Sequence, residues 1–237
     1  MTQVVNVKVK YLRPRYTDLR HWLSDPNNVY VGRHGRIFIN KEIFHYSASI
    51  FNNPFPIDAD NPRDTVIDKY RTYILDRLRN EPMLVNELLK LQGKTLGCWC
   101  KPDACHGDVL IEILNAYSSD LYKAAQDGME TLHKYFQNNL PTESDLLIVY
   151  SLTTNEESQA LIGQYLFLLQ NHLNTFYPWY PEKNITNLMV IAARDYLPLL
   201  NSKKPELFDD LIKYKDIQGK SAVDYAVSQE MLKILRQ

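Results

Sequence analysis

The chain has 237 residues and a formal net charge of −1, from 27 basic and 28 acidic side chains. This length suits one large domain or two small ones, and the balanced charge excludes the strongly basic surface that is typical of proteins that bind duplex nucleic acid or an anionic membrane. No run approaches the roughly 18 apolar residues of a spanning helix, and the N-terminus lacks the apolar core of a signal peptide. We therefore expect a soluble, cytoplasmic protein with no membrane partner.

The first predicted elements are short. Alternating β-branched residues predict a strand over 4–10, and residues 18–23 predict one or two helical turns. Two further short strands are predicted at 29–31 and 36–39. Residues 47–61 are rich in Asn, Pro and Asp and predict a loop.

Longer elements follow this loop. Apolar residues at helical spacing predict a helix over 63–78 and a second over 82–91. Residues 95–100 predict a buried strand, after which Asp103 is expected to cap a helix that ends near Tyr117. This order predicts an α/β fold with a small, partly parallel sheet of the Rossmann-like type.

The rest of the chain is almost entirely helical in pattern. We place an α/β domain at residues 1–125, a connecting helix and linker at 126–144, and an all-α module at 145–237. A possible protein partner would bind through this helical module.

A weak internal repeat lies in the helical part. One copy begins at Asn184 and includes Pro205–Leu207, and the pattern recurs from Gly219, an offset of 35 residues. Such a period indicates stacked helix pairs. Residues 216–226 resemble the opening turn and first helix of an ankyrin repeat, whereas the earlier copy departs from that pattern at Asn187.

All three cysteines lie between positions 98 and 105. Side chains alternate along a strand, so Cys98 and Cys100 are expected to face the same way, while Cys105 and His106 fall in the first turn of the next helix. Ligands of open α/β sheets bind outside the carboxyl ends of strands, and a helix N-terminus favours anions. The segment therefore predicts a pocket in which Cys105 is the nucleophile, His106 an acid/base and Cys100 a second thiol.

Two other interpretations of this segment stay open. Cys98, Cys100, Cys105 and His106 are zinc-ligand types, although their close spacing is atypical of a structural zinc site, and we otherwise expect no cofactor. Alternatively, the cysteines simply pack in the core. In the pocket interpretation Gly107 permits the close approach of a ligand or of another backbone, and Asp108 orients His106 or binds a ligand hydroxyl.

Several segments agree, in order, with one known family. They are Val5-Asn6-Val7, Tyr30-Val31-Gly32-Arg33, Asn53-Pro54-Phe55, Arg63 with Tyr70-Arg71, and Gly97-Cys98-Trp99-Cys100 with Cys105-His106-Gly107-Asp108. With these motifs, residues 3–117 resemble the small α/β domains catalogued as domain of unknown function 4326, which has no established reaction. The chain departs from the pattern at Asn52, where glycine is usual, and in a longer stretch over 35–51. Members occur in phages, large DNA viruses and bacteria, so the resemblance implies the host cytoplasm if the source is viral.

The resemblance adds four candidate ligand contacts. Arg33 and Arg63 offer a bidentate fork to a phosphate or carboxylate, Asn53 offers an amide or a turn, and Phe55 a ring for stacking. The favoured hypothesis is a domain that binds or processes a small anionic, nucleotide-like molecule, fused to an ankyrin-like interaction module. The alternatives are a non-catalytic protein-interaction protein, in a viral setting one that binds a host protein, and a zinc-stabilised structural domain.

Overall fold

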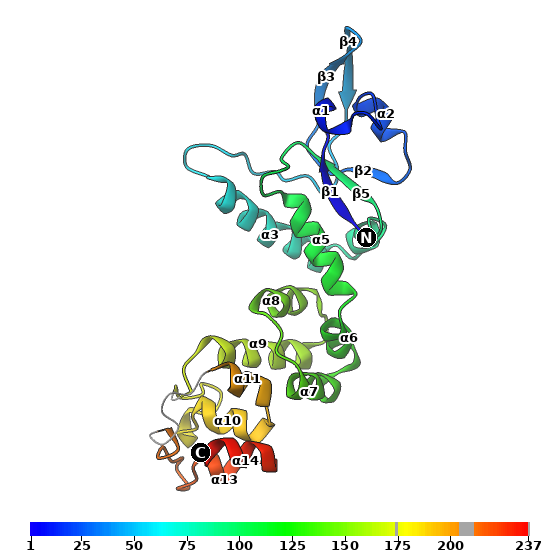
Figure 1. Cartoon of the computed structure of the whole chain (residues 1–237). Coiled ribbons are helices and arrows are strands. Elements are labelled where there is room, and N and C mark those ends of the chain that lie inside the picture. The colour runs from blue at the N-terminus through cyan, green and yellow to red at the C-terminus, as the bar shows by residue number, and fades with distance from the viewer. Residues whose placement is uncertain (174, 204–210, 237) are drawn as a thin grey trace. The chain divides into compact units, whose positions relative to one another are not determined.

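The computed structural model describes residues 1–173, 175–203 and 211–236 (Figure 1). It divides into two compact units, Met1–Ser118 and Ser119–Gln237. No helix within the described ranges is both long and apolar enough to cross a membrane.

A small parallel sheet lies at the centre of the first unit. Its strands β1 (Gln3–Asn6), β5 (Thr95–Cys98) and β2 (Asn28–Tyr30) are arranged in the order β1-β5-β2, so that β5 is paired on both edges. Burial on both faces suits β5, in which Leu96, Gly97 and Cys98 are all buried. The α/β class and the small parallel sheet predicted from the sequence are therefore confirmed.

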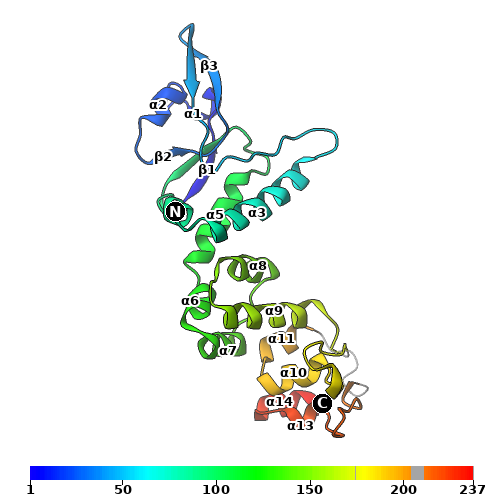
Figure 2. The ribbon, with the colours of Figure 1, turned by 180° about the vertical axis from the view of Figure 1, so that it is seen from behind.

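Helices pack on this sheet from two sides. Helix α5 (His106–Tyr117) packs on β1 and β5, and α3 (Arg63–Asn80) and α4 (Pro82–Leu89) pack on α5. Helices α1 (Val9–Leu12) and α2 (Leu19–Leu23) pack on β1 and β2 (Figure 2). The long helices predicted near 63–78 and 82–91 are thus present.

Strand alternation assigns side chains to the two faces. At Gly97 a Cβ atom would lie 2.4 Å from the ring of Trp22, so this position of β5 has no room for a side chain. On the other face Val4 contacts the start of α5, where a Cβ on Gly107 would lie 2.9 Å from a Val4 methyl. The neighbouring Cys98 projects to the same side, because its Sγ lies 3.9 Å from His106 of α5.

The first strand is shorter than the sequence predicted. The Asn6 Oδ1 atom accepts a hydrogen bond of 2.8 Å from the Lys8 backbone N–H, and this local turn ends β1. Helix α1 then begins at Val9, so the prediction of a strand as far as Lys10 was wrong.

The longer stretch near residues 35–51 is an antiparallel hairpin. Strands β3 (Gly35–Ile39) and β4 (Glu42–Tyr46) pair through a turn in which Asn40 and Lys41 have φ angles of 52° and 69°. The sequence predicted β3 but not β4. After the hairpin, residues 52–60 contain no helix or strand, in agreement with the predicted loop.

The second unit is helical. Its described elements are α6 (Asp120–Asp127), α7 (Met129–Asn138), α8 (Glu143–Leu152), α9 (Glu156–Gln170), the 3₁₀ turn η1 (Pro181–Lys183), α10 (Asn187–Arg194), α11 (Leu197–Ser202), α13 (Ala222–Tyr225) and α14 (Gln229–Leu235). Helices α6 and α7 occupy most of the stretch for which the sequence predicted a connecting helix and linker, and they pack against α8 and α9.

The internal repeat has structural counterparts. Asn184 and Gly219 both adopt left-handed backbone, with φ angles of 51° and 78°. Two residues later, Thr186 and Ser221 are the N-caps of α10 and α13. The Pro205–Leu207 part of the repeat lies outside the described residues, and the Rossmann-like and ankyrin-like descriptions stay predictions.

Candidate functional site

A cavity of about 320 Å³ lies at the carboxyl ends of β2 and β5 and at the start of α3 and α5. This is the edge at which parallel sheets bind ligands. Its lining residues are Tyr30, Gly32, Arg33, His34, Tyr46, Asn53, Phe55, Ile57, Arg63, Val66, Ile67, Cys98, Trp99, Cys100 and His106.

Most of the residues singled out from the sequence lie around this cavity. Those that line it are Arg33, Asn53, Phe55, Arg63, Cys98, Cys100 and His106. Cys105, Gly107 and Asp108 are not among the lining residues. Segments distant in the sequence thus converge on one site, while the start of α5 contributes only its first side chain to the wall.

Arg33 holds the loop that forms one wall. Its Nε–H donates to the Asn53 carbonyl at 2.5 Å, and its Nη2 donates to the Phe55 carbonyl. The Asn53 side chain accepts from the Phe55 N–H at 2.9 Å, which is the turn interpretation considered for Asn53. Much of the bonding capacity of Arg33 is therefore used to position the Asn53–Phe55 wall.

Tyr70 of α3 anchors the start of the loop that contains Asn53 and Phe55. Its hydroxyl is fully buried and donates to the Phe51 carbonyl at 2.8 Å. Its ring lies edge-on to that of His106, with centroids 5.0 Å apart. Tyr70 therefore connects the loop to the imidazole at the start of α5.

Arg63 is the first residue of α3 and faces the loop that precedes α5. Its Nη1 donates to the Ala104 carbonyl at 3.2 Å, and its Nη2 lies 3.4 Å from an Asp103 carboxylate oxygen. Because that ion pair is partly exposed, solvent screens it. Arg63 is nevertheless among the residues that line the cavity.

Three rings form an aromatic wall. The Tyr30 and Tyr46 rings meet edge to face at 5.2 Å, and Tyr46 and Trp99 lie 6.0 Å apart at an interplanar angle of 36°. The indole N–H of Trp99 donates to the Tyr30 hydroxyl at 2.9 Å. Trp99 and Tyr30 both belong to the family motifs found in the sequence, whereas Tyr46 could not be found because its strand was not predicted.

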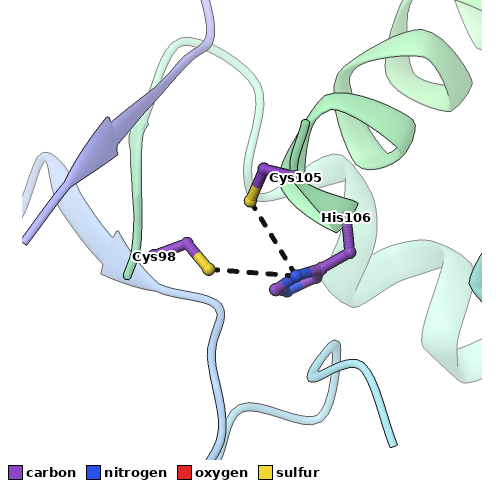
Figure 3. Close-up of side chains that lie close together, drawn as sticks. All are labelled: Cys98, Cys105 and His106. Carbon is purple, nitrogen blue, oxygen red and sulfur yellow. Dashed lines mark hydrogen bonds between the residues drawn. The ribbon is translucent and has the colours of Figure 1, made fainter. Parts of the chain in front are cut away.

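Behind this wall the sulfur atoms and one imidazole form a compact cluster. The Cys98 and Cys105 Sγ atoms each lie 3.9 Å from His106 Nδ1 (Figure 3), and the Cys98 and Cys100 Sγ atoms are 3.5 Å apart. Cys98, Cys105 and His106 are buried, whereas Cys100 is partly exposed toward the cavity. All three cysteines are free thiols.

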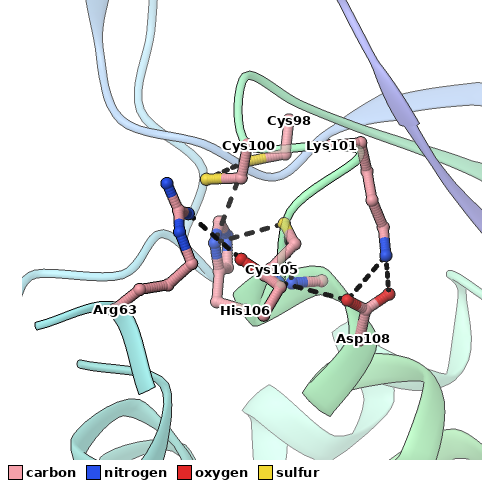
Figure 4. A network of polar contacts seen from close by, with 9 residues as sticks. Arg63, Cys98, Cys100, Lys101, Cys105, His106 and Asp108 are labelled. Carbon is pink, nitrogen blue, oxygen red and sulfur yellow. Dashed lines mark hydrogen bonds and ion pairs between the residues drawn. The ribbon is translucent and has the colours of Figure 1, made fainter. Parts of the chain in front are cut away.

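The start of α5 is fixed by a capping box rather than by Asp103, so that prediction was wrong. Cys105 is the N-cap, its Sγ accepts from the Gly107 N–H at 3.4 Å, and the Asp108 carboxylate accepts from the Cys105 N–H at 3.1 Å. Asp108 also pairs with Lys101 at 2.7 Å (Figure 4). Asp108 thus holds the backbone before the helix and is not the partner of His106.

The actual partner of His106 is a backbone carbonyl. His106 Nε2 lies 2.8 Å from the Val31 oxygen. A carbonyl can only accept, so Nε2 carries a proton and Nδ1 is the nitrogen that faces the sulfurs.

The members of this cluster shift one another's pKa values. Hydrogen bonds from Cys105 and Cys98 hold the pKa of Cys100 far below its usual value. The bonds to Cys100 and Cys98, together with burial, raise the pKa of Cys105 far above it. Burial is the largest influence on His106 and lowers its pKa, but hydrogen bonds with Cys100 and Cys98 outweigh it and raise that pKa to about 9.

The same donors can hold a metal ion. The ligand atoms of Cys98, Cys105 and His106 all lie within 4.8 Å of one another. Sulfur and imidazole nitrogen are soft or borderline donors, which suit a transition-metal ion rather than Mg²⁺ or Ca²⁺. Metal binding is therefore within the chemical capacity of the cluster.

Comparison with known proteins places this site within a family. Residues 15–116 match the family model described as domain of unknown function (DUF4326). An uncharacterized 12.4 kDa protein encoded in the nrdA-td intergenic region of Enterobacteria phage T4 is 33% identical over 95 residues, which are 38% of this chain and 86% of the phage protein. Uncharacterized protein R718 of Acanthamoeba polyphaga mimivirus is 30% identical over 107 residues, which are 40% of this chain and 75% of that protein. No solved structure matches the chain.

Proposed function

The chain belongs to the DUF4326 family, and we propose that its cavity binds a small anionic molecule that carries a flat ring, of the mononucleotide class. The observation that carries this proposal is that a single cavity is lined both by two arginines, Arg33 and Arg63, and by the aromatic wall of Tyr30, Tyr46 and Trp99. These two kinds of surface match the two parts of such a ligand.

The size of the cavity favours a small member of this class. Ligand sites commonly measure about 300–1,000 Å³, and a cavity of about 320 Å³ lies at the lower end of that range. A mononucleotide therefore suits it better than a dinucleotide. Stacking of a base on an aromatic ring contributes about 1–3 kcal/mol without requiring a particular base.

The anionic group of the ligand would lie at the start of α3. Arg63 is the first residue of that helix, and Val66 and Ile67 in its first turns also line the cavity. Unpaired backbone N–H groups and the positive end of the helix dipole favour an anion there. Arg33, which holds the Asn53–Phe55 wall, would contribute mainly by keeping the site in shape.

The proposal concerns binding. The catalytic roles predicted for Cys105, His106 and Cys100 stay predictions, as do the ligand contacts predicted for Gly107 and Asp108. Cys105 is buried and is not a lining residue of the cavity, so a nucleophilic role for it would require a ligand to reach past His106.

Isothermal titration calorimetry with the four nucleoside monophosphates, their nucleosides and inorganic phosphate tests the proposal. Charge-assisted hydrogen bonds contribute about 1.5–3 kcal/mol, so Arg63→Ala should weaken the binding of a nucleotide about tenfold or more and leave that of its nucleoside nearly unchanged. Arg36→Ala removes the same charge from an exposed position of β3 outside the cavity and should change neither. Lack of saturable binding across the panel, or equal losses in both variants, would refute the proposal.

For the second unit we propose an ankyrin-like interaction module. The left-handed Asn184 and Gly219 and the N-caps Thr186 and Ser221, each pair 35 residues apart in the sequence, support a repeated helix pair. An experimental structure in which the α10–α11 and α13–α14 pairs do not superpose would rule the module out.

A further inference from the structure

We propose that Cys98, Cys100, Cys105 and His106 bind one zinc ion in a tetrahedral Cys₃His site beneath the cavity. The proposal is independent of the ligand proposed for the cavity, because it rests on the geometry of the sulfur and nitrogen atoms alone.

Three distances in the cluster are close to the edges of a zinc tetrahedron, and Cys100 joins the close group of Cys98, Cys105 and His106 through its contact with Cys98. With Zn–S bonds of about 2.3 Å and Zn–N bonds of about 2.0 Å, two sulfur ligands lie about 3.8 Å apart and a sulfur and a nitrogen about 3.5 Å apart. The observed separations are 3.5 Å between Cys98 and Cys100 Sγ, and 3.9 Å from His106 Nδ1 to each of Cys98 and Cys105 Sγ. An ion can therefore enter with small side-chain movements.

The imidazole is already set for coordination. The bond of 2.8 Å between His106 Nε2 and the Val31 carbonyl fixes the ring orientation and directs Nδ1 at the sulfurs. A carbonyl or carboxylate partner on the second nitrogen is the usual support of a histidine that binds a metal. The Gly107 N–H, which donates to Cys105 Sγ, gives one sulfur comparable support.

One carboxylate that is close to the cluster in the sequence is already engaged elsewhere. Asp108, the carboxylate on the first turn of α5, is held by Lys101 and by the Cys105 N–H. The donor set is thus three sulfurs and one nitrogen, which selects zinc over Mg²⁺ or Ca²⁺. Cys98, Cys100 and His106 line the cavity, and Cys100 is the most exposed of the four proposed ligands.

The sequence makes this site easy to measure. The chain has just these three cysteines, so every thiolate signal of the full-length protein reports on the cluster. The protein purified without a chelator should contain about one zinc ion per chain, as measured by inductively coupled plasma mass spectrometry. Replacement of zinc by Co²⁺ should give the intense visible bands of a tetrahedral ion and the near-ultraviolet band of cobalt–thiolate bonds.

Matched variants assign the ligands. Cys98→Ser, Cys105→Ser and His106→Ala should each lose at least tenfold in zinc affinity, measured by competition with a chromophoric chelator. Cys100→Ser should keep the ion but reduce the cobalt–thiolate absorbance by about one third, because one of the three sulfurs is gone. His34→Ala, a cavity-lining histidine with no place in the cluster, should match the unchanged protein.

The cobalt spectrum of the unchanged chain keeps the test decisive even if a variant fails to fold. A full-length protein that contains no zinc, shows three freely titratable thiols and gives an octahedral cobalt spectrum would overturn the proposal. The nucleotide titrations with Arg63→Ala test the cavity separately, so a failure of the zinc proposal can be told apart from a failure of the ligand proposal.

Discussion

Gly107 offers a sharp test of how the site is built, because the start of α5 packs against β1 at this residue. A Cβ at position 107 would lie 2.9 Å and 3.1 Å from the two methyl groups of Val4. Valine is stiff at χ1 and belongs to β1, so its methyls cannot turn away cheaply. The close approach of α5 to β1 therefore requires a glycine.

The size of the effect follows from these contacts. Overpacking of this kind costs about 1–3 kcal/mol. Alanine would recover at most about 1 kcal/mol of helix propensity over glycine, and less so near a helix start. We expect Gly107→Ala to lower the free energy of unfolding by about 1–2 kcal/mol.

A double-mutant cycle separates packing from other causes. Val4→Ala alone removes two partly buried methyl-sized groups and should cost about 1 kcal/mol. In the double variant the new methyl at 107 occupies the space vacated at 4, so the combined loss should be smaller than the sum by about 1 kcal/mol. Urea unfolding followed by tryptophan fluorescence measures all four proteins, since Trp22 and Trp99 both report on the first unit.

Additive losses would refute this reasoning, since they would mean that the two positions do not share space. A Gly107→Ala variant of unchanged stability but altered ligand affinity would instead restore the ligand role.

Two further predictions address single side chains. Tyr70→Phe leaves the buried Phe51 carbonyl without its hydrogen-bond donor and should lower the free energy of unfolding in urea by about 1–3 kcal/mol. The control Tyr73→Phe changes a partly exposed residue of the same helix and should alter that free energy by no more than about 0.5 kcal/mol. Equal effects of the two substitutions would contradict the anchoring role of the Tyr70 hydroxyl. In the second unit, burial, followed by the charge of Arg194, lowers the pKa of His133 below its usual 6.5, and the Tyr196 hydroxyl lies 2.7 Å from its Nδ1. The folded state then binds fewer protons than the unfolded state, so stability should be lost as the pH falls through about 6.5. The thermal midpoint of the His133→Gln variant should depend less on pH over that range than the midpoint of the unchanged protein. Identical pH profiles of the two proteins would exclude a role for His133.

Local patterns predicted the elements that carry strong periodicity. The helices near 63–80 and 82–89 and the strand at 95–98 follow from apolar spacing, which directly reflects burial on one face or two. Strand β4 has no such period, and its turn at Asn40–Lys41 lacks the glycine that usually marks a hairpin. Pairing with β3 determines that strand, and pairing is not a local property.

The site shows the same division between local and tertiary causes. The family motifs, and the tendency of ligands to bind at the carboxyl ends of parallel strands, predicted a shared site for Arg33, Asn53, Arg63 and the Cys98–His106 segment. In the structure these three residues line one cavity, together with Cys98, Cys100 and His106 of that segment. Cysteine is not a preferred N-cap, so propensity favoured Asp103 over Cys105. The bonds of Arg33 to the Asn53–Phe55 loop depend on where the loop folds back, which no spacing encodes.

The two proposals constrain each other through charge. A zinc ion bound by three thiolates and a neutral imidazole would leave the cluster with a net negative charge, so the anionic group of a ligand in the same cavity would need an arginine to offset that charge. Of the two arginines that line the cavity, Arg33 already gives its Nε and Nη2 to loop carbonyls. Arg63 is held by the Ala104 carbonyl and by a partly exposed ion pair with Asp103, and an incoming phosphate can replace that carboxylate as its partner. Arg63 should therefore be the arginine whose removal affects anion binding most.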